Sequence, residues 1–404
     1  MKLQGKYGEA KVFASTLEED SREQIIELLD QDFIEGAKVR IMPDVHLGVG
    51  CVIGFTADMQ DKVIPNIVGV DIGCGMLTVK LGEAYLDLPK FDKIVKETIP
   101  ASYKTHPNRI VKFDRLKDLH CYRSLENTKR IERSIGSLGG GNHFIELGED
   151  SKKDKYLIIH TGSRNLGKQV ADYYQQLAID LCSGKGELFK RREELIASYK
   201  AAGRRKEIKG ALIELEKEYQ GLEAKYPKDL CFLEGEYRQN YLHDMEICQE
   251  YASLNRRTIA NLILRKATGR SLEDYEHFET VHNYIDFRDN IIRKGAIAAH
   301  AGEEILIPIN MRDGSILAVG KGNPDWNQSA PHGAGRVLSR NQARKTHSLD
   351  QFIEDMEGIY STSVSEKTLD ENPRAYKPKE EILAFLEETA EVKEIIKPIY
   401  NFKA

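Results

Sequence analysis

The chain has 404 residues, enough for two ordinary domains or one large one. Its 59 Lys and Arg against 64 Asp and Glu give a net charge of −5, which excludes a globally basic nucleic-acid-binding protein but leaves room for a local basic groove. No apolar run approaches the roughly 18 residues that a membrane helix needs, and the first residues, MKLQGKYGEAKVF, lack the apolar core of a signal peptide. We therefore expect a cytoplasmic protein with no membrane partner.

The N-terminal part predicts a mixture of helix and strand. Apolar periodicity at 21–29 indicates a short amphipathic helix, and 39–41 and 52–53 read as strands. Between these strands, MPDVHLGVG at 42–50 has the Pro and Gly content of a loop. A second glycine-rich segment, GVDIGCGM, is followed by a predicted strand at 77–81.

The next part of the chain is read as mixed helix and loop at 85–135, followed by the glycine-rich turn SLGGGNHFIEL at 137–147. The apolar run YLIIH predicts a buried strand that ends in His160. The segment TGSRNLG then leads into a helix from about Lys168.

A charged segment at 186–228 differs from its surroundings. It is dense in Lys, Arg and Glu and carries an apolar stripe spaced 4-3-4-3-4, which is typical of helices packed along a narrow seam. The stripe comprises Ile208, Leu212, Leu215, Tyr219, Leu222 and Tyr226. We expect two antiparallel helices with their turn near 202–205.

The remainder predicts helix at 236–270, then strands and loops, then a tail at 371–404 with one short helix and a terminal extension. No internal repeat or low-complexity linker divides the chain. We therefore expect a single large α+β domain over 1–404, with the charged helical hairpin at 186–228 as an insertion.

The cysteines give little sign of a disulfide framework. They are Cys51, Cys74, Cys121, Cys182, Cys231 and Cys248. Because they are spread thinly and form no CxxC pair, we expect at most one or two of them to take part in chemistry.

Five of the eleven histidines lie beside glycine or small polar residues in loop-like contexts: His46, His143, His160, His282 and His332. A histidine at the end of a strand, next to a flexible turn, is presented to a ligand by a rigid scaffold. Each one alone is more often an ordinary core or surface histidine. Five together, with Asp71 and Cys74 between glycines, favour a functional site.

Asp71 and Cys74 offer a carboxylate and a thiolate on one turn. The thiolate is able to bridge two metal ions, with the dispersed histidines completing their coordination. Sulfur and nitrogen ligands favour Zn or Fe, whereas a carboxylate and open positions suit Mn or Mg, so composition leaves the metal open. The alternative is that Cys74 is a small buried apolar residue.

Several glycine-rich segments, among them GGGNHF, TGSRNLG, VGKGN and HGAGR, carry a nearby basic or amide side chain. Their N–H groups are able to cradle phosphate oxygens, although none matches a P-loop or a dinucleotide-binding motif. His332 in HGAGR is the strongest candidate nucleophile, because imidazole can attack phosphorus and form a phosphoramidate. Arg336 is placed to pair with a phosphate.

In chain order, the motifs MPDVHLG, GVDIGCGM, LGGGNHFIEL, HTGSRNLG, SLNR, HNY, GKGN and HGAGRVLSR resemble those of the RtcB family of RNA-splicing ligases. The resemblance runs from the first of these motifs to the C-terminus, and DIGCG together with HGAGR is highly specific. It implies a single large α+β domain with mixed β-sheets around a metal and GTP site.

The resemblance also implies a reaction. Family members join an RNA end bearing a 2′,3′-cyclic phosphate or 3′-phosphate to a 5′-hydroxyl end, using GTP and Mn²⁺, with two ions in each active site. A histidine attacks the GTP α-phosphorus and holds GMP covalently. GMP then passes to the RNA 3′-phosphate, and the 5′-hydroxyl displaces it.

Carried over to this chain, the metal ligands would be Asp71, Cys74, His143, His160 and His282, with Cys74 between two ions. His332 would be the nucleophile. The GTP pocket would be lined by Asn142, His143, Phe144, Ile145, Glu146, His282, Asn283, Pro308, Ile309, Asn310, Met311, Ser315, His332, Gly333, Ala334, Gly335 and Lys403. Lys403 would reach the guanine, with Tyr376 in the same pocket. Asp44, His46 and Arg164 would position RNA or support the ligands.

The chain departs from the family pattern beside the expected GTP pocket. Where members usually have P-G-[ST]-M-G, this sequence has PINMR, so Ile309 replaces Gly, Asn310 replaces a hydroxyl residue and Arg312 replaces Gly. Pro331 and Ala404 also depart from common residues. We expect weaker GTP binding than in members with the usual motif, and a branch specialised in the repair of cleaved tRNA or other RNA.

Two other functions compete with the ligase. A metal-dependent RNA-end phosphoesterase would keep the metal ligands while the GTP pocket decays, and a non-catalytic RNA-binding protein would need neither. The intact ligands and His332 favour the ligase. In the hairpin, Lys190, Arg191, Arg192, Arg204, Arg205 and Lys206 are candidates for contact with RNA phosphates, against the alternative of a solvated helical face.

Overall fold

A seven-stranded antiparallel sheet carries several of the residues predicted for the site, in the strand order β12-β13-β15-β6-β7-β5-β8. The computed structural model describes residues 1–403. The strands of this sheet are β5 (Gly75–Gly82), β6 (Phe144–Glu149), β7 (Lys155–Thr161), β8 (His277–Val281), β12 (Glu304–Asn310), β13 (Gly314–Gly320) and β15 (Ala390–Lys403).

A second sheet has six strands in the order β1-β2-β3-β4-β10-β9, and β11 pairs with β14 beside it. Only β2 and β3 run parallel among these pairs. The strands are β1 (Lys2–Gln4), β2 (Glu9–Val12), β3 (Val39–His46), β4 (Ile53–Asp58), β9 (Tyr284–Asp286), β10 (Ile291–Lys294), β11 (Ala296–Ala298) and β14 (Ser329–Pro331). The α+β class with mixed sheets, predicted from the sequence, is confirmed.

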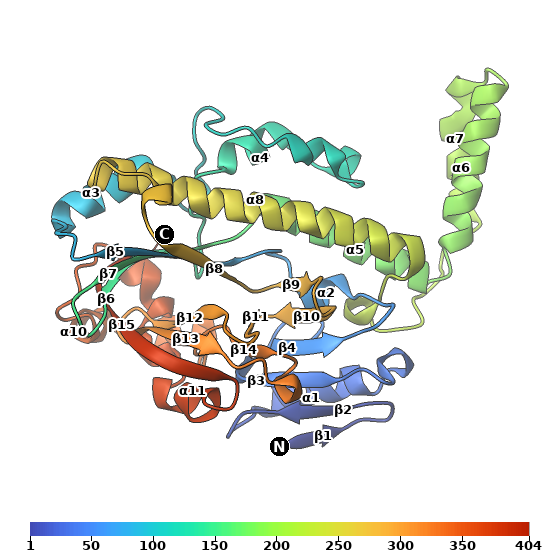
Figure 1. The fold of residues 1–404 in the computed structure, drawn as a ribbon. Coiled ribbons are helices and arrows are strands. Elements are labelled where there is room, and N and C mark those ends of the chain that lie inside the picture. Colours follow the sequence, from blue (N-terminus) through green and yellow to red (C-terminus); the bar gives the residue numbers. More distant parts are fainter. Residues whose placement is uncertain (404) are drawn as a thin grey trace.

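Helices α5 (Arg164–Cys182) and α8 (Gly235–Ala267) cross the molecule side by side above the sheets (Figure 1). The apolar face of α8 packs with β5, β7 and α3 (Leu88–Thr98) in one buried cluster. The remaining helices are α1 (Glu19–Leu29), α2 (Pro65–Val68), α4 (Thr128–Ser134), α9 (Arg340–Thr346), α10 (Leu349–Asp355) and α11 (Lys379–Leu386). The short 3₁₀ helices are η1 (Asp32–Ile34), η2 (Asp114–Asp118), η3 (Tyr122–Ser124), η4 (Arg205–Glu207), η5 (Lys228–Leu230), η6 (Leu272–Asp274), η7 (Pro324–Trp326), η8 (Glu366–Glu371) and η9 (Pro373–Ala375).

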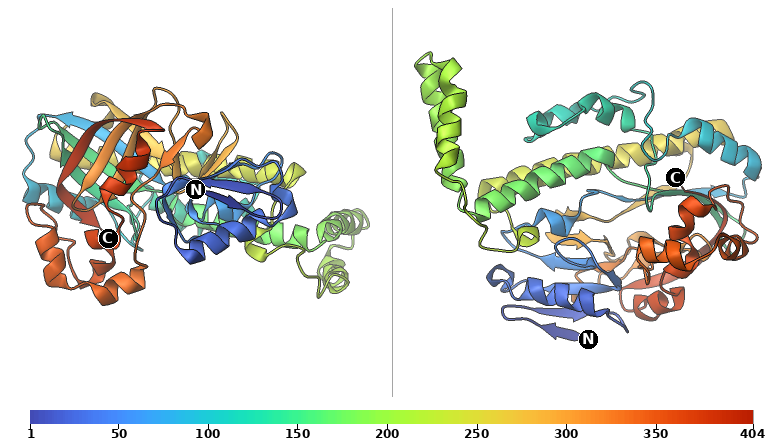
Figure 2. Two further views of the ribbon diagram at one scale, coloured as in Figure 1. Left: turned by 90° about the horizontal axis from the view of Figure 1, so that it is seen from below. Right: turned by 180° about the vertical axis from the view of Figure 1, so that it is seen from behind.

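The charged segment forms an arm of two helices, α6 (Gly186–Ala201) and α7 (Ile208–Lys217), which projects away from the body in every view (Figure 2). The helix of the apolar stripe is shorter than expected, because α7 ends at Lys217 rather than continuing to Tyr226. Gly221 adopts a left-handed backbone with φ +78°, and Pro227 follows, so both residues oppose a longer helix.

Two other expectations need correction. The predicted loop at 42–50 is partly strand, because β3 continues to His46 through a register shift that accommodates Pro43. The predicted terminal extension is β15, a long strand in the middle of the seven-stranded sheet, between β13 and β6. Two register irregularities interrupt its alternation, which hides the strand period in the sequence. Within residues 1–403, no helix combines the length and apolar character needed to cross a membrane.

Candidate metal and nucleotide site

The DIGCG turn is anchored between two strands and a helix. Cys74 immediately precedes β5, and its carbonyl accepts a hydrogen bond from the backbone N–H of His282 at 2.8 Å. A side chain at Gly75 would collide with the backbone of Thr280, so glycine allows β5 and β8 to approach closely here. This pairing brings Cys74 and His282 together from distant parts of the chain.

Arg256 of the SLNR motif, on α8, holds the same loops from behind. Its buried guanidinium donates to the carbonyl of Gly73 at 2.8 Å and to that of Thr161 at 2.9 Å, and it pairs with Glu279. Arg256 therefore links the Cys74 turn to the end of β7, where His160 lies. The sequence analysis quoted the motif but assigned this arginine no role.

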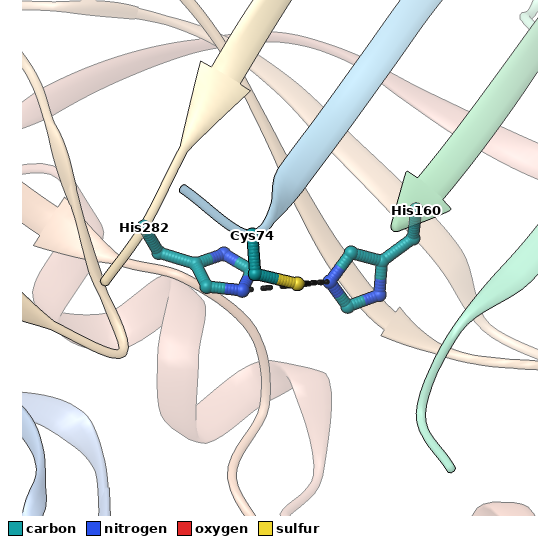
Figure 3. A group of neighbouring side chains, drawn as sticks. All are labelled: Cys74, His160 and His282. Carbon is teal, nitrogen blue, oxygen red and sulfur yellow. Dashed lines mark hydrogen bonds between the residues drawn. The ribbon is translucent and has the colours of Figure 1, made fainter. Parts of the chain in front are cut away.

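Five side chains converge at the ends of these strands. Cys74 Sγ lies 3.4 Å from Nε2 of His143 and 3.4 Å from Nε2 of His160. His160 Nε2 lies 3.4 Å from His282 Nε2, and His143 Nε2 lies 3.0 Å from an oxygen of Asp71. Figure 3 shows Cys74 and His282 directed at the same ring nitrogen of His160.

Without a metal ion, these side chains do not satisfy all of one another's hydrogen-bonding atoms. Burial, followed by the neighbouring imidazoles, holds the pKa of His160 and of His282 well below the ordinary value, so both rings are neutral. Nδ1 of His143 and Nδ1 of His282 are buried and have no hydrogen-bond partner. Burial also raises the pKa of the Cys74 thiol, and Asp71 adds to that effect.

The same atoms form two overlapping candidate metal groups, Asp71–Cys74–His143 and Cys74–His160–His282. Cys74 belongs to both, which is the arrangement expected of a thiolate between two ions. The Asn142 carbonyl lies 3.2 Å from His160 Nδ1, so the ring donates there and turns its Nε2 lone pair to the cluster. The donor set fits divalent cations, and all five residues named as metal ligands lie together.

His332, the expected nucleophile, follows β14 and is fixed by Asp44 on β3. One oxygen of the fully buried Asp44 accepts from His332 Nδ1 at 2.7 Å, from the His332 N–H at 3.0 Å and from the Gly333 N–H at 3.1 Å. These bonds leave Nε2 of His332 as the free ring nitrogen. The His332 ring lies 4.8 Å from that of His282, at 71°, so the nucleophile candidate borders the metal cluster.

A cavity opens beside His332. Of the residues named for the GTP pocket, its walls include Asn142, Phe144, Glu146, Pro308, Ile309, Asn310, Met311, His332, Gly333, Ala334, Gly335, Lys403 and the neighbouring Tyr376. His160 reaches the same cavity, which therefore connects the metal cluster to the HGAGR turn.

Other residues named for the pocket lie elsewhere. Ile145 points to the opposite face of β6 and packs in the core beneath α8, because side chains alternate along a strand. Ser315 is buried on β13 and does not line the cavity. The side chain of Asn283 donates to the carbonyl of Asp71 at 3.4 Å and accepts from the N–H of Gly295 at 2.9 Å. It therefore stabilises these turns. His143 and His282 belong to the metal cluster.

Two polar residues near Lys403, Glu371 and Asn401, were not among the residues predicted for the site. Lys403 forms a buried ion pair with Glu371, and Glu371 also accepts from Tyr376 at 2.7 Å and from Arg340 at 2.7 Å. Asn401 donates to Glu146 at 2.8 Å, while burial raises the pKa of Glu146 to about 8. No local motif marks Glu371 or Asn401, because η8 and β15 bring them to this region from separate parts of the chain.

Two residues expected to face ligands are engaged with the protein. We expected Arg336 to pair with a phosphate. Its guanidinium instead contacts the Tyr376 hydroxyl at 3.0 Å and the Asp370 carbonyl. Arg164 donates to Ser137 and Ser102, at 3.2 and 2.9 Å, and braces the loop before His143. His46 lines the cavity, and burial lowers its pKa to about 4.

The loop that departs from the family pattern is closed on itself. The Asn310 amide donates to Asp313 at 2.8 Å, and its oxygen accepts from the backbone N–H groups of Arg312 and Asp313, at 2.9 and 2.8 Å. Ile309 is buried in an apolar cluster. Asn310 therefore does not take the place of the Ser or Thr hydroxyl of the usual motif, because its amide is hydrogen-bonded within its own turn.

Comparison with known proteins agrees with the motifs. A sequence model of the family described as "tRNA-splicing ligase RtcB" matches residues 24–122 and 101–404. The RNA-splicing ligase RtcB of Escherichia coli K12 is 29% identical over 414 residues, which cover 93% of this chain and 92% of that protein. The tRNA-splicing ligases RtcB of Archaeoglobus fulgidus and Aeropyrum pernix are 25% and 24% identical, covering 91% and 83% of this chain and 87% and 81% of their own lengths. The chain belongs to the RtcB family, as a divergent member.

Proposed function

We propose that this protein is a GTP- and Mn²⁺-dependent RNA ligase. It joins 2′,3′-cyclic phosphate or 3′-phosphate ends to 5′-hydroxyl ends through a histidine–GMP intermediate, in the repair of tRNA or other RNA. The observation that carries the proposal is the juxtaposition of two ligand groups sharing Cys74 with His332, whose ring borders that of His282 at 4.8 Å. The relatives named as RNA ligases support the same reaction class.

The residues of the site suit an attack on phosphorus. Asp44 accepts a hydrogen bond from the Nδ1–H of His332. The lone pair of Nε2 is therefore available to bond the α-phosphorus of GTP as pyrophosphate leaves. Asp71, Cys74, His143, His160 and His282 would hold two Mn²⁺ ions, which supply positive charge to the triphosphate. Water opens a 2′,3′-cyclic phosphate end to a 3′-phosphate. The RNA 3′-phosphate then takes GMP from His332, and the 5′-hydroxyl displaces GMP.

The nucleotide would occupy the cavity between the HGAGR turn and Lys403. Lys403 and Glu146 supply one donor and one titratable carboxyl to the walls of this cavity, and a purine edge presents both acceptors and donors. Tyr376 and Phe144 add aromatic surface to the same walls. These groups make the part of the cavity around Lys403 the expected place for guanine.

Labelling with GTP tests the proposal. The purified protein is incubated with Mn²⁺ and GTP labelled at the α-phosphate, and label that survives denaturation is counted. We expect covalent label in the wild type and in His120→Ala, whose histidine is exposed and outside the cavity, and none in His332→Ala. Absence of label in metal-loaded, folded wild type would reject the ligase.

The alternative function, a metal-dependent RNA-end phosphoesterase, is favoured by one observation. Asn310 and Arg336 line the cavity, but both are hydrogen-bonded within the protein, whereas all five candidate metal ligands are present. An enzyme of this kind would release or open terminal phosphates without labelling His332. Phosphate release from a 3′-phosphorylated RNA in the same incubation, without label, would select it.

A further inference from the structure

Two cysteines that are far apart in the sequence meet where the arm joins the body. Cys182 is the last residue of α5, and Cys231 directly follows η5. The two thiols are close enough for each to shift the pKa of the other. Cys182 Sγ also lies 3.8 Å from the carbonyl of Phe232, the residue next to Cys231.

The backbone reinforces this meeting point. The N–H of Lys225 donates to the carbonyl of Cys182 at 3.1 Å, so the segment that returns from the arm is hydrogen-bonded to the end of α5. Cys231 Sγ approaches the carbonyls of Pro227 and Tyr226, at 3.5 and 3.8 Å. All of the arm, α6 and α7 included, lies between the two cysteines in the sequence.

The two thiols differ in access and in acidity. Cys182 is half-buried, whereas Cys231 is fully buried. The hydrogen bond from Cys231 lowers the pKa of Cys182 to about 7, and the same contact raises the pKa of Cys231. An accessible thiol with a lowered pKa beside a buried second thiol is the pattern of a reactive and a resolving cysteine.

We propose that Cys182 and Cys231 form a reversible dithiol–disulfide site that closes the base of the arm, with a peroxide as the oxidant. The Cys182 thiolate attacks one peroxide oxygen, the O–O bond breaks, and Cys182 becomes a sulfenic acid as hydroxide takes up a proton. The sulfur of Cys231 then attacks the Cys182 sulfur, the S–S bond forms, and water leaves with the Cys231 proton. A dithiol reductant reverses the reaction and is itself oxidised to its disulfide. This reaction does not require the proposed ligase activity.

The arm offers a direct readout. Trypsin is expected to cut the exposed tip at Arg204–Lys206, which lies between the two cysteines. After treatment with one equivalent of hydrogen peroxide, the two fragments should stay joined on a non-reducing denaturing gel and separate after reduction. Intact mass should fall by two hydrogens, with Cys51, Cys74, Cys121 and Cys248 still open to alkylation after unfolding.

Variants assign the roles. Cys182→Ser should abolish the linkage, and Cys231→Ser should leave a sulfenic acid on Cys182 that dimedone traps. Cys51→Ala, which removes a buried thiol whose pKa burial raises to about 12, should link like the wild type. The proposal is overturned if the wild type oxidises at Cys74 before Cys182, or if Cys182 oxidises and no bond to Cys231 forms. None of these readouts uses RNA or GTP, so failure of the ligase proposal leaves them unaffected.

Discussion

Asp44 and His332 are joined side chain to side chain at 2.7 Å, from elements that lie almost three hundred residues apart. The carboxylate is fully buried, and the same oxygen also receives the backbone N–H groups of His332 and Gly333. One residue of the MPDVHLG motif thus sets both the tautomer and the orientation of the histidine in HGAGR. The motifs MPDVHLG and HGAGR therefore come into contact only when the chain is folded.

Replacing Asp44 with Asn should therefore slow transfer of GMP to His332 while preserving the fold. The amide of Asn can present a donor to Nδ1, which shifts the ring proton to the nitrogen that must attack. Loss of a comparable orienting carboxylate costs up to about 10⁴-fold in rate, and we expect a loss of at least about 10²-fold.

The rate of label incorporation is measured beside GTP affinity, which should change little. Asp325→Asn is the matched control, because Asp325 pairs with Lys11 and Arg40 and does not line the cavity beside His332. A labelling rate in Asp44→Asn equal to that of the wild type would show that Asp44 does not orient the nucleophile.

Cys74→Ala should disable the metal centre. Both candidate metal groups lose the ligand that they share, so we expect less than one tightly bound Mn²⁺ per chain instead of two, and no label at His332. Cys74→Ser should rescue little, because an alcohol is not an anion at neutral pH, whereas a thiol bound to a metal loses its proton.

Metal content is measured by elemental analysis after dialysis against Mn²⁺. His120→Ala with His243→Ala is the matched control, since these residues form a separate histidine–aspartate group with Asp244. Two bound ions and normal turnover in Cys74→Ala would exclude a bridging role for the thiolate.

The grouping of the candidate metal ligands was predictable because each lies in a motif with its own local signature. Asp71 and Cys74 sit between glycines, and His160 ends an apolar strand. Asn401 and Glu371 were not predictable in this way. The place of Asn401 in the cavity wall, and the contact of Glu371 with Lys403, depend on which strand β15 pairs with and in which register. Two irregularities conceal that register in the sequence.

The same limit applies to single side chains within a motif. Ile145 was included in the pocket with Phe144 and Glu146, yet a strand sends alternate residues to opposite faces. The end of α7 was missed because an apolar stripe reports only the spacing of apolar residues, whereas Gly221 and Pro227 decide where the chain leaves the helix.

The basic residues of the arm divide into paired and unpaired sets. Arg191 pairs with Glu218 at 2.6 Å, and Arg204 pairs with Glu207 at 3.0 Å between Nε and Oε1. No ion pair is found for Arg205 or Lys206 at the tip within the described residues. If the arm contacts RNA, these two cations at the tip are available to phosphates.

The double variant Arg205→Glu, Lys206→Glu should then bind a 5′-hydroxyl RNA several-fold more weakly at low salt, with the difference vanishing as salt increases. Labelling of His332 should not change, because the arm projects away from the body (Figure 1). Arg204→Gln with Glu207→Gln keeps the net charge and serves as the control. Equal RNA affinity of the charge-reversed protein and the wild type at low salt would favour a solvated helical face.

Asn310 explains why GTP should bind weakly, and Asn310→Ser should improve it. Three hydrogen bonds hold the amide in its own turn, so its orientation is set by Arg312 and Asp313 rather than by the nucleotide. A serine hydroxyl can keep a bond to the N–H two residues on, or turn to a phosphate or ribose oxygen. One added hydrogen bond to a charged group is worth about 1.5–3 kcal/mol, which corresponds to tenfold or more in affinity.

GTP affinity is measured by calorimetry for wild type, Asn310→Ser and Asn310→Ala. The alanine variant removes the amide without supplying a hydroxyl, so it should bind no more tightly than the wild type. Ile309 is left in place, because it is buried in an apolar cluster and truncation of such a side chain costs about 2–5 kcal/mol of stability. If serine and alanine at position 310 bind GTP equally, the missing hydroxyl is not what weakens this pocket.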